Sequence, residues 1–126
     1  MIVADTHALV WWVAGDQRLS AKALAVMNES IVGFAAITCW EIAQLTARGR
    51  LQLVAPIKAW WDKVMNLPVT TLFPITPDIA VIAASISDPI RDPADRLIVA
   101  TALHHGAPLV TKDERIRAAG IVETIW

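Results

Sequence analysis

Four acidic residues lie where predicted strands or loops give way to helices or turns. They are Asp5, Glu41, Asp95 and Asp113. In open α/β sheets, ligand sites form beyond the carboxyl ends of the strands, so we expect these side chains to face one end of a sheet. Clustered carboxylates repel one another unless they are protonated or bind a cation, and Mg²⁺ and Mn²⁺ prefer such oxygen ligands. The four positions therefore predict a pocket for divalent cations.

Each acid also has a purely structural interpretation. Thr38-x-x-Glu41 fits a capping box, in which the glutamate side chain reaches back to a free backbone N–H at the start of a helix. Asp92 fits the N-cap of a later helix, with Asp95 at its third position. The remaining two acids fit a helix cap and a turn. Capping alone does not explain why four junctions at one end of the sheet all carry an acid, and this favours the cation pocket.

Strands and helices are expected to alternate along the chain. Apolar runs predict strands at residues 2–4, 31–35, 69–73, 108–111 and 121–125. Helical patterns and capping signals cover residues 8–14, 20–28, 38–48, 76–86, 93–105 and 112–119, and a further helix begins near Pro56. This alternation predicts an α/β fold with a central, mostly parallel sheet of four to five strands, flanked by helices on both faces.

The composition limits the class of protein. The chain has 126 residues, of which 56% are hydrophobic, and this fits a single domain over residues 1–126. No apolar run reaches the roughly 18 residues that a membrane helix requires, and the N-terminus lacks the pattern of a signal peptide. The one cysteine, Cys39, cannot form an internal disulfide. We therefore expect a soluble, cytoplasmic protein that does not act in a membrane.

The net charge argues against a simple electrostatic binder of nucleic acid. The formal charge is −1, whereas such binders usually carry a basic excess. A metal-dependent nuclease is less affected, because bound cations supply positive charge at the phosphate.

The acids lie in motifs that resemble those of PIN-domain ribonucleases. The motifs are Ile2-Val3-Ala4-Asp5-Thr6-His7-Ala8-Leu9, Thr38-Cys39-Trp40-Glu41-Ile42-Ala43, Asp92-Pro93-Ala94-Asp95-Arg96-Leu97-Ile98-Val99-Ala100-Thr101-Ala102 and Leu109-Val110-Thr111-Lys112-Asp113. The third motif is the most specific. Order, spacing and total length agree, so the resemblance covers essentially the whole chain. The closest subgroup is the VapC-type toxins of bacterial and archaeal toxin–antitoxin pairs.

The resemblance implies a PIN-like fold and an endoribonuclease that depends on Mg²⁺ or Mn²⁺. It places the metal-binding acids of the family at Asp5, Glu41, Asp95 and Asp113. It also implies an RNA substrate cut to 5′-phosphate and 3′-hydroxyl ends, a cognate antitoxin whose C-terminal segment wraps the toxin, and a homodimer.

Within this scheme we expect Asp5, Asp95 and Asp113 to hold the main cation, while Glu41 completes the shell or acts as a general base. Thr111 matches a hydroxyl position that often supports the pocket.

Two further positions within the motifs are open to interpretation. Cys39 stands where many relatives have a small polar residue, but it is not a ligand position. Asp92 could be a fifth acid at the rim of the pocket, although its N-cap role is favoured.

Six tryptophans are many for a chain of this length: Trp11, Trp12, Trp40, Trp60, Trp61 and Trp126. Their rings could stack on bases, but packing in the core and at interfaces is favoured. Neighbouring residues on a helix point about 100° apart, so an adjacent pair seldom buries both rings in one core. We therefore expect at least one ring of each adjacent pair to contact another chain.

Several basic side chains are weaker candidates for RNA contact: His7, Arg48, Arg50, Arg115 and Arg117. For Arg96, beside Asp95, a structural ion pair is favoured.

Three alternatives remain at this point. A phosphatase-like hydrolase or a phosphoacceptor domain also uses a strand-end aspartate, but Asp5 lacks the accompanying acids that these classes show. A non-catalytic α/β binding module would use the acids only as caps and would have no cation affinity. A PIN-domain nuclease could also act in RNA processing or DNA cleavage instead of as a toxin.

Overall fold

The first strand of the chain lies at the centre of a parallel sheet. In the computed structural model, which describes residues 1–126, β1 (Ile2–Ala4) pairs with β2 (Val32–Ala35) and with β4 (Leu109–Val110). The edges are β3 (Thr70–Phe73) and β5 (Thr124–Ile125), which gives the order β3-β2-β1-β4-β5. All four pairings are parallel. The carboxyl ends of all the strands therefore lie along one edge, which we call the carboxyl edge.

The central strands are apolar on both faces. Ile2 and Ala4 belong to one buried cluster, whereas Val3 between them belongs to another. Leu109 and Val110 of β4 are divided between the two clusters in the same way. Because successive side chains of a strand point to opposite faces, both sides of this sheet have to be covered.

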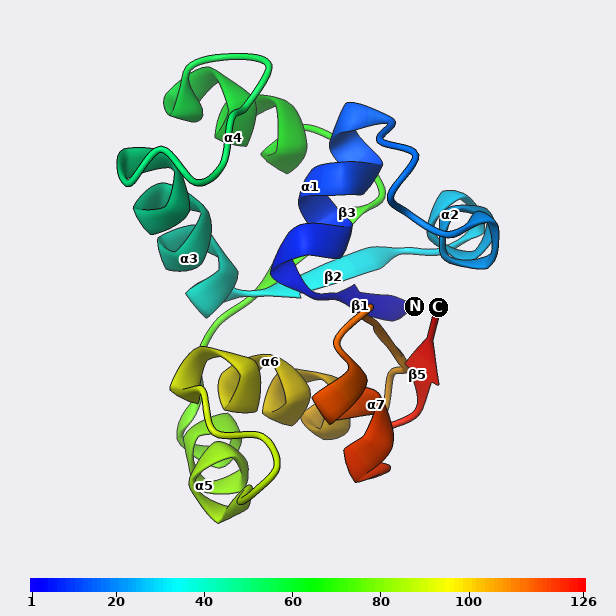
Figure 1. Cartoon of the computed structure of the whole chain (residues 1–126), viewed down its shortest axis with the longest axis vertical. Coiled ribbons are helices and arrows are strands. Elements are labelled where there is room, and N and C mark those ends of the chain that lie inside the picture. The colour runs from blue at the N-terminus through cyan, green and yellow to red at the C-terminus, as the bar shows by residue number, and fades with distance from the viewer.

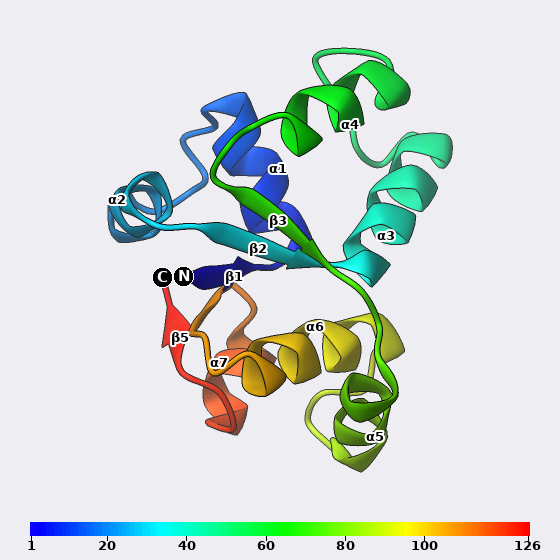
Figure 2. The ribbon, with the colours of Figure 1, turned by 180° about the vertical axis from the view of Figure 1, so that it is seen from behind.

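Seven helices cover the two faces of the sheet (Figure 1). Residues of α1 (Thr6–Ala14), α2 (Ala21–Glu29), α3 (Ala36–Ala47) and α4 (Ile57–Met65) form the core on one face. Residues of α5 (Pro77–Ser85), α6 (Pro93–His104) and α7 (Glu114–Ala119) form the core on the other. The view from behind shows the same two layers with the sheet between them (Figure 2). The predicted α/β fold is confirmed, with five strands that are all parallel.

The membrane prediction can be compared with the helices directly. None of the seven is both long enough and apolar enough to cross a membrane.

One helix begins earlier than the sequence suggests. We expected a start at Thr38, but α3 begins at Ala36, directly after β2, and Ala35 at its N-cap provides no side-chain hydrogen bond. Ala35 and Thr38 are both fully buried. Packing at the end of β2, and not a polar cap, therefore sets the start of this helix.

Backbone hydrogen bonds extend the sheet past the ends of two strands. The Asp5 N–H donates to the Val110 carbonyl at 3.0 Å, and the Thr111 N–H donates to the Ile125 carbonyl at 3.2 Å. These bonds fix the backbone of Asp5 and Thr111 side by side at the carboxyl edge, where the predicted site lies.

Gly33 in β2 leaves room for the ring of Phe73, the last residue of β3. A methyl group added at Gly33 would overlap with the Phe73 side chain. The Phe73 ring also stacks on His105, with 3.8 Å between the ring centroids. A glycine is thus required for the Phe73 ring to cover its neighbouring strand and reach the residue just past α6.

Replacing Gly33 with alanine should destabilise the fold by about 1–3 kcal/mol, because the added methyl group overpacks a filled region. Urea unfolding followed by tryptophan fluorescence measures the loss. In the double variant Gly33→Ala/Phe73→Leu the two losses should not add, since the smaller side chain removes the overlap. Strict additivity would show that Phe73 does not limit the space at Gly33.

Candidate metal centre

Three helix N-caps bring acids to the carboxyl edge. Asp5 caps α1 by accepting a hydrogen bond from a backbone N–H at 2.8 Å. Asp92 caps α6 through one such bond at 2.8 Å, and Asp113 caps α7 through two, at 2.8 and 3.2 Å. All these bonds go to Oδ1. The backbone therefore fixes each carboxylate through one oxygen, so a capping role and a ligand role are compatible.

Glu41 does not belong to a capping box. It is the sixth residue of α3, and its Oε1 accepts a hydrogen bond from the Thr6 hydroxyl at 2.6 Å. The Thr6 hydroxyl also lies 3.4 Å from the Thr38 hydroxyl, and both threonines are buried. The capping box considered as an alternative does not form, because α3 begins two residues before Thr38 and Glu41 therefore lies in its second turn. Thr6, the residue that follows Asp5, orients the Glu41 carboxylate instead.

Glu41, Asp92 and Asp95 form the tightest group of acids. One carboxylate oxygen from each lies within 4.8 Å of the others. Asp5 and Asp113 lie outside this group of three, yet both raise the pKa of Asp95 by charge repulsion, so they lie close enough to act on it. The structure thus brings together the four predicted acids and adds Asp92. We call these five residues the carboxylate pocket.

Asp95 is the least compensated member of the carboxylate pocket. Burial is the largest cause of its perturbation, followed by repulsion from Asp92 and Glu41, and together with the other two acids they raise its pKa to about 7. No hydrogen bond to the carboxylate opposes this shift. The charged form of this half-buried aspartate is disfavoured because no positive charge lies near enough to stabilise it.

Two other pocket acids are shifted in the same direction. Burial raises the pKa of Asp5, against the effect of hydrogen bonds from the Thr111 side chain and the Ala8 N–H. Burial also raises the pKa of Glu41, although the hydrogen bond from Thr6 opposes it. The fold therefore holds these carboxylates where their charged form is disfavoured.

No arginine or lysine neutralises the pocket. The two ion pairs of the structure involve Asp16 and Asp88, which lie outside it. Arg96, for which we favoured an ion pair, instead donates its Nε–H to the Ile90 carbonyl at 2.6 Å. That prediction is wrong because the loop before α6 presents a carbonyl to the guanidinium. An all-carboxylate donor set without a protein counter-charge fits a hard divalent cation.

Threonine hydroxyls support the pocket. Thr111 accepts a hydrogen bond from the Asp113 N–H at 3.1 Å, and its side chain lowers the pKa of Asp5. Thr6, which orients Glu41, was missed by sequence reasoning. A signal was present, since a hydroxyl follows a strand-end acid, but the helix was expected to begin only at Ala8.

Two hollows adjoin the carboxylate pocket on the side of α3 and α6. The larger, of about 420 Å³, we call the Trp40 groove; it is lined by Ile37, Trp40, Asp92, Pro93, Ala94 and Leu97. The smaller, of about 230 Å³, includes Trp40, Glu41 and Asp92 in its wall. Trp40 contributes to both hollows and is 55% exposed. An apolar surface therefore lies directly beside the acids.

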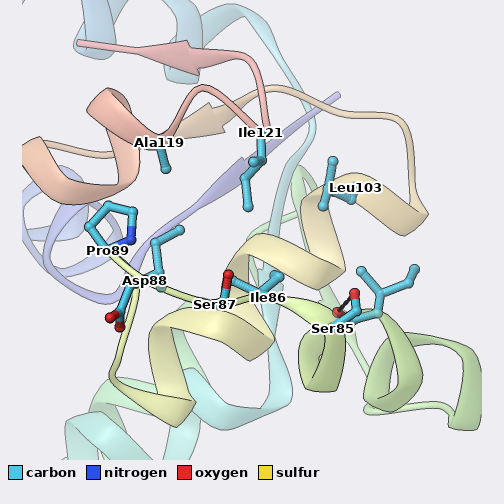
Figure 3. Close-up of a pocket in the computed structure, with 10 residues that line it drawn as sticks. Ser85, Ile86, Ser87, Asp88, Pro89, Leu103, Ala119 and Ile121 are labelled. Carbon is cyan, nitrogen blue, oxygen red and sulfur yellow. Dashed lines mark hydrogen bonds between the residues drawn. The ribbon is translucent and has the colours of Figure 1, made fainter.

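A third cavity lies apart from the acids (Figure 3). It has a volume of about 280 Å³ and lies between the loop after α5, the end of α6 and α7. Most of its lining is apolar, and the Ser85 hydroxyl already donates to the Ile82 carbonyl at 2.7 Å. None of the five pocket acids lines it, so it is not part of the candidate centre.

The adjacent tryptophan pairs pack largely within the chain. Trp11 and Trp60 are buried, while Trp12 and Trp61 are half-buried against the same core. Contact of these pairs with another chain stays a prediction. Trp40 is the ring with the most exposed surface.

Comparisons with known proteins identify the family of the chain. The family model of the PIN domain matches residues 2–122. The chain is 40% identical to Ribonuclease VapC22 of Mycobacterium tuberculosis over 119 residues, which cover 93% of this chain and 90% of that protein.

Two solved structures share the fold. A toxin–antitoxin complex from Klebsiella pneumoniae superposes with a TM-score of 0.69 at 19% identity, covering 100% of this chain and 97% of the other. Mycobacterium tuberculosis VapC20, described as a toxin that cleaves the sarcin–ricin loop, gives a TM-score of 0.68 at 20% identity and covers 98% of both chains.

The chain belongs to the PIN-domain family, as a ribonuclease of the VapC type. The resemblance drawn from the four motifs is confirmed. The alternatives of a phosphatase, a phosphoacceptor domain or a non-catalytic module are set aside.

Without cations, the folded protein should lose stability as the pH rises from 5 to 8. The pKa of Asp95 is about 7 in the fold against 3.8 for the unperturbed side chain. A raised pKa stabilises the fold below the unfolded value, and this contribution is lost as the pH rises through the folded value. The pKa shifts of Asp5 and Glu41 act in the same direction. Thermal melts in chelator measure the fall.

The Asp95→Asn variant provides the control, because it removes this charge at every pH. It should melt at a higher temperature than the unmodified protein at pH 8 and show a smaller fall. Equal melting temperatures of the variant and the unmodified protein at pH 8 would contradict the claim that the charge of Asp95 destabilises the fold.

Proposed function

We propose that this ribonuclease holds Mg²⁺ or Mn²⁺ with Asp5, Glu41, Asp95 and Asp113, with Asp92 at the rim, and cleaves RNA internally. The observation that carries the proposal is the state of Asp95, whose pKa is raised to about 7 among four other acids with no protein cation to compensate it. Divalent cations supply the missing positive charge, and carboxylate oxygens are the ligands that such hard cations prefer.

The side chains then have distinct roles. When bound, the cation would supply an activated water nucleophile and offset charge on the phosphate and the leaving oxygen. Asp5 and Asp113 are fixed by backbone N–H groups and are suited to hold it. Glu41 has its Oε1 engaged by Thr6, which leaves Oε2 to orient the attacking water and accept its proton. In-line displacement of the 3′ oxygen leaves 5′-phosphate and 3′-hydroxyl ends.

Purified protein should cut mixed cellular RNA with Mg²⁺ or Mn²⁺ and leave it intact in chelator. The Asp5→Asn and Asp95→Asn variants should lose about 100-fold or more in rate, the scale of one lost preorganised electrostatic contact. Gel analysis gives the rates, and adaptor ligation that requires a 5′-phosphate identifies the ends.

Asp78→Asn is the matched control, since this exposed acid lies in the first turn of α5 and outside the pocket. It should cleave at the unmodified rate. Full activity of a well-folded Asp5→Asn protein, or cleavage that chelator does not affect, would refute the proposed site.

The biological role we propose is that of a toxin whose cognate antitoxin blocks this site. A neighbour of the same fold was solved as a toxin–antitoxin complex, and the chain is a VapC-type ribonuclease. A pocket with five acids and no protein counter-charge suits an antitoxin segment that brings a basic side chain to it. Since cellular RNA is the proposed substrate, we place the activity in the cytoplasm.

We further propose a homodimer built on the Trp40 groove. Trp40 on α3 is 55% exposed and Val81 on α5 is 71% exposed, and α3, α5 and α6 lie along one side of the molecule (Figure 1). Exposed apolar patches of this kind mark protein interfaces more often than free surface. A second copy would cover the apolar lining of the groove, including the exposed Trp40 ring.

The Trp40→Glu variant should be monomeric where the unmodified protein is dimeric, because a charge at the centre of an apolar interface cannot be solvated there. Light scattering after size exclusion gives the mass of each form. Leu24→Glu, an exposed position on α2, should leave the dimer intact. A Trp40→Glu protein that stays dimeric would place the interface elsewhere.

A further inference from the structure

The acids of the carboxylate pocket repel the phosphates of an RNA strand, and bound cations remove only part of this repulsion. Cations offset the charge at the phosphate that is attacked. The neighbouring phosphates of the same strand still approach an edge that carries five acids, and the chain as a whole has a net charge of −1. Positive or hydrogen-bonding groups at the rim are therefore required to hold the strand.

Such groups surround the Trp11 ring, on the side of the pocket formed by Asp5 and Asp113. The His7 ring lies 5.6 Å from the Trp11 ring, and the Lys112 ammonium lies 5.8 Å from its centroid. His7 is the second residue after Asp5, and Lys112 directly precedes Asp113. Two elements that each carry a pocket acid thus bring a basic side chain over the same aromatic ring.

Both basic groups are free to bind a ligand. Arg18 also lies over Trp11, at 5.1 Å, but it is held by Asp16 through contacts of 2.7 and 3.1 Å. Lys112 takes part in neither ion pair of the structure, although it adjoins Asp113. Its contact with Trp11 is a cation–π interaction, which orients the ammonium without neutralising it. His7 and Lys112 are both exposed.

His7 also lies close to the pocket itself. Its positive form lowers the pKa of Asp5 and of Glu41. The imidazole thus lies beside the Trp11 ring and within electrostatic reach of these two acids.

We propose that Lys112 and His7 form a binding subsite for the RNA phosphate next to the one that is cleaved, with Trp11 as the platform that positions them. The subsite rests on the proposed ribonuclease function. Lys112 provides a full charge, and His7 provides an N–H donor in either protonation state. A phosphate held there keeps the strand in register while the cations act on its neighbour.

Steady-state cleavage of a random-sequence, single-stranded RNA 20-mer tests the subsite. Lys112→Gln and His7→Gln should each raise KM about 3- to 10-fold, the scale of one ordinary hydrogen bond, with kcat within about twofold. For Lys112→Gln, the slope of log(kcat/KM) against log[KCl] should also become shallower by about 0.7, the value for one lost phosphate contact on a single strand. Lys112→Arg should restore both values.

Two controls match these variants in chemistry. Lys22→Gln lies on α2, away from the carboxyl edge, and His104→Gln lies at the last residue of α6, whose first turn holds Asp95. Both side chains are exposed, and both variants should keep the original KM and salt slope.

The outcomes separate the subsite from the function on which it rests. If the unmodified protein does not cleave the RNA with any cation, the proposed function fails. If it cleaves, and Lys112→Gln keeps the original KM and slope, the subsite is refuted. A Lys112→Gln protein with a lower melting temperature but an unchanged salt slope would show a purely structural contact with Trp11, which also refutes it.

Discussion

Mutual repulsion between carboxylates is the constraint on which this structure depends. Five acids share one edge of the sheet, and for Asp95 burial and repulsion move the pKa to about 7. Such an arrangement is unfavourable for an isolated fold, so the rest of the molecule has to hold the acids together. The parallel sheet does this through its topology, because every strand ends at the same edge. The backbone does it locally, since Asp5, Asp92 and Asp113 each accept N–H bonds at a helix start.

The distribution of positive charge follows the same logic. The partial positive charge at the N-termini of helices stabilises the acids there without a basic side chain. The two nearby arginines are occupied elsewhere, Arg96 by a carbonyl and Arg18 by Asp16, whereas Lys112 lies over the Trp11 ring without an ion-pair partner. The centre of the pocket therefore stays without a protein cation, while its rim keeps groups that can meet an anionic strand. This separation is what a metal-dependent nuclease requires, since a lysine in the pocket would compete with the cation.

Much of this arrangement could be predicted from the sequence, because the signals involved are local. Alternation of apolar runs with capped helices gave the α/β class, and acids at the junctions gave the four candidate ligands. What could not be predicted depends on contacts distant in the chain. The start of α3 is set by packing at the end of β2, so the capping box considered as an alternative role for Glu41 does not form. The bond between Thr6 and Glu41 joins residues on different helices. The partner of Arg96 depended on the path of the preceding loop. For Asp92 the sequence offered both a cap and a place at the rim, and only the structure shows that it caps α6 and also approaches Glu41.

The most direct test of the account is to locate the cation. Crystals of the protein grown with Mn²⁺ can be measured at the manganese absorption edge, where the ion scatters anomalously. The account predicts an anomalous peak in the carboxylate pocket, in contact with Asp95 and at least one of Asp5 and Asp113, and no such peak in crystals of the Asp95→Asn variant. A pocket without a peak in Mn²⁺-soaked crystals of the unmodified protein, or a peak that the substitution leaves unchanged, would contradict the claim that these acids form the metal centre.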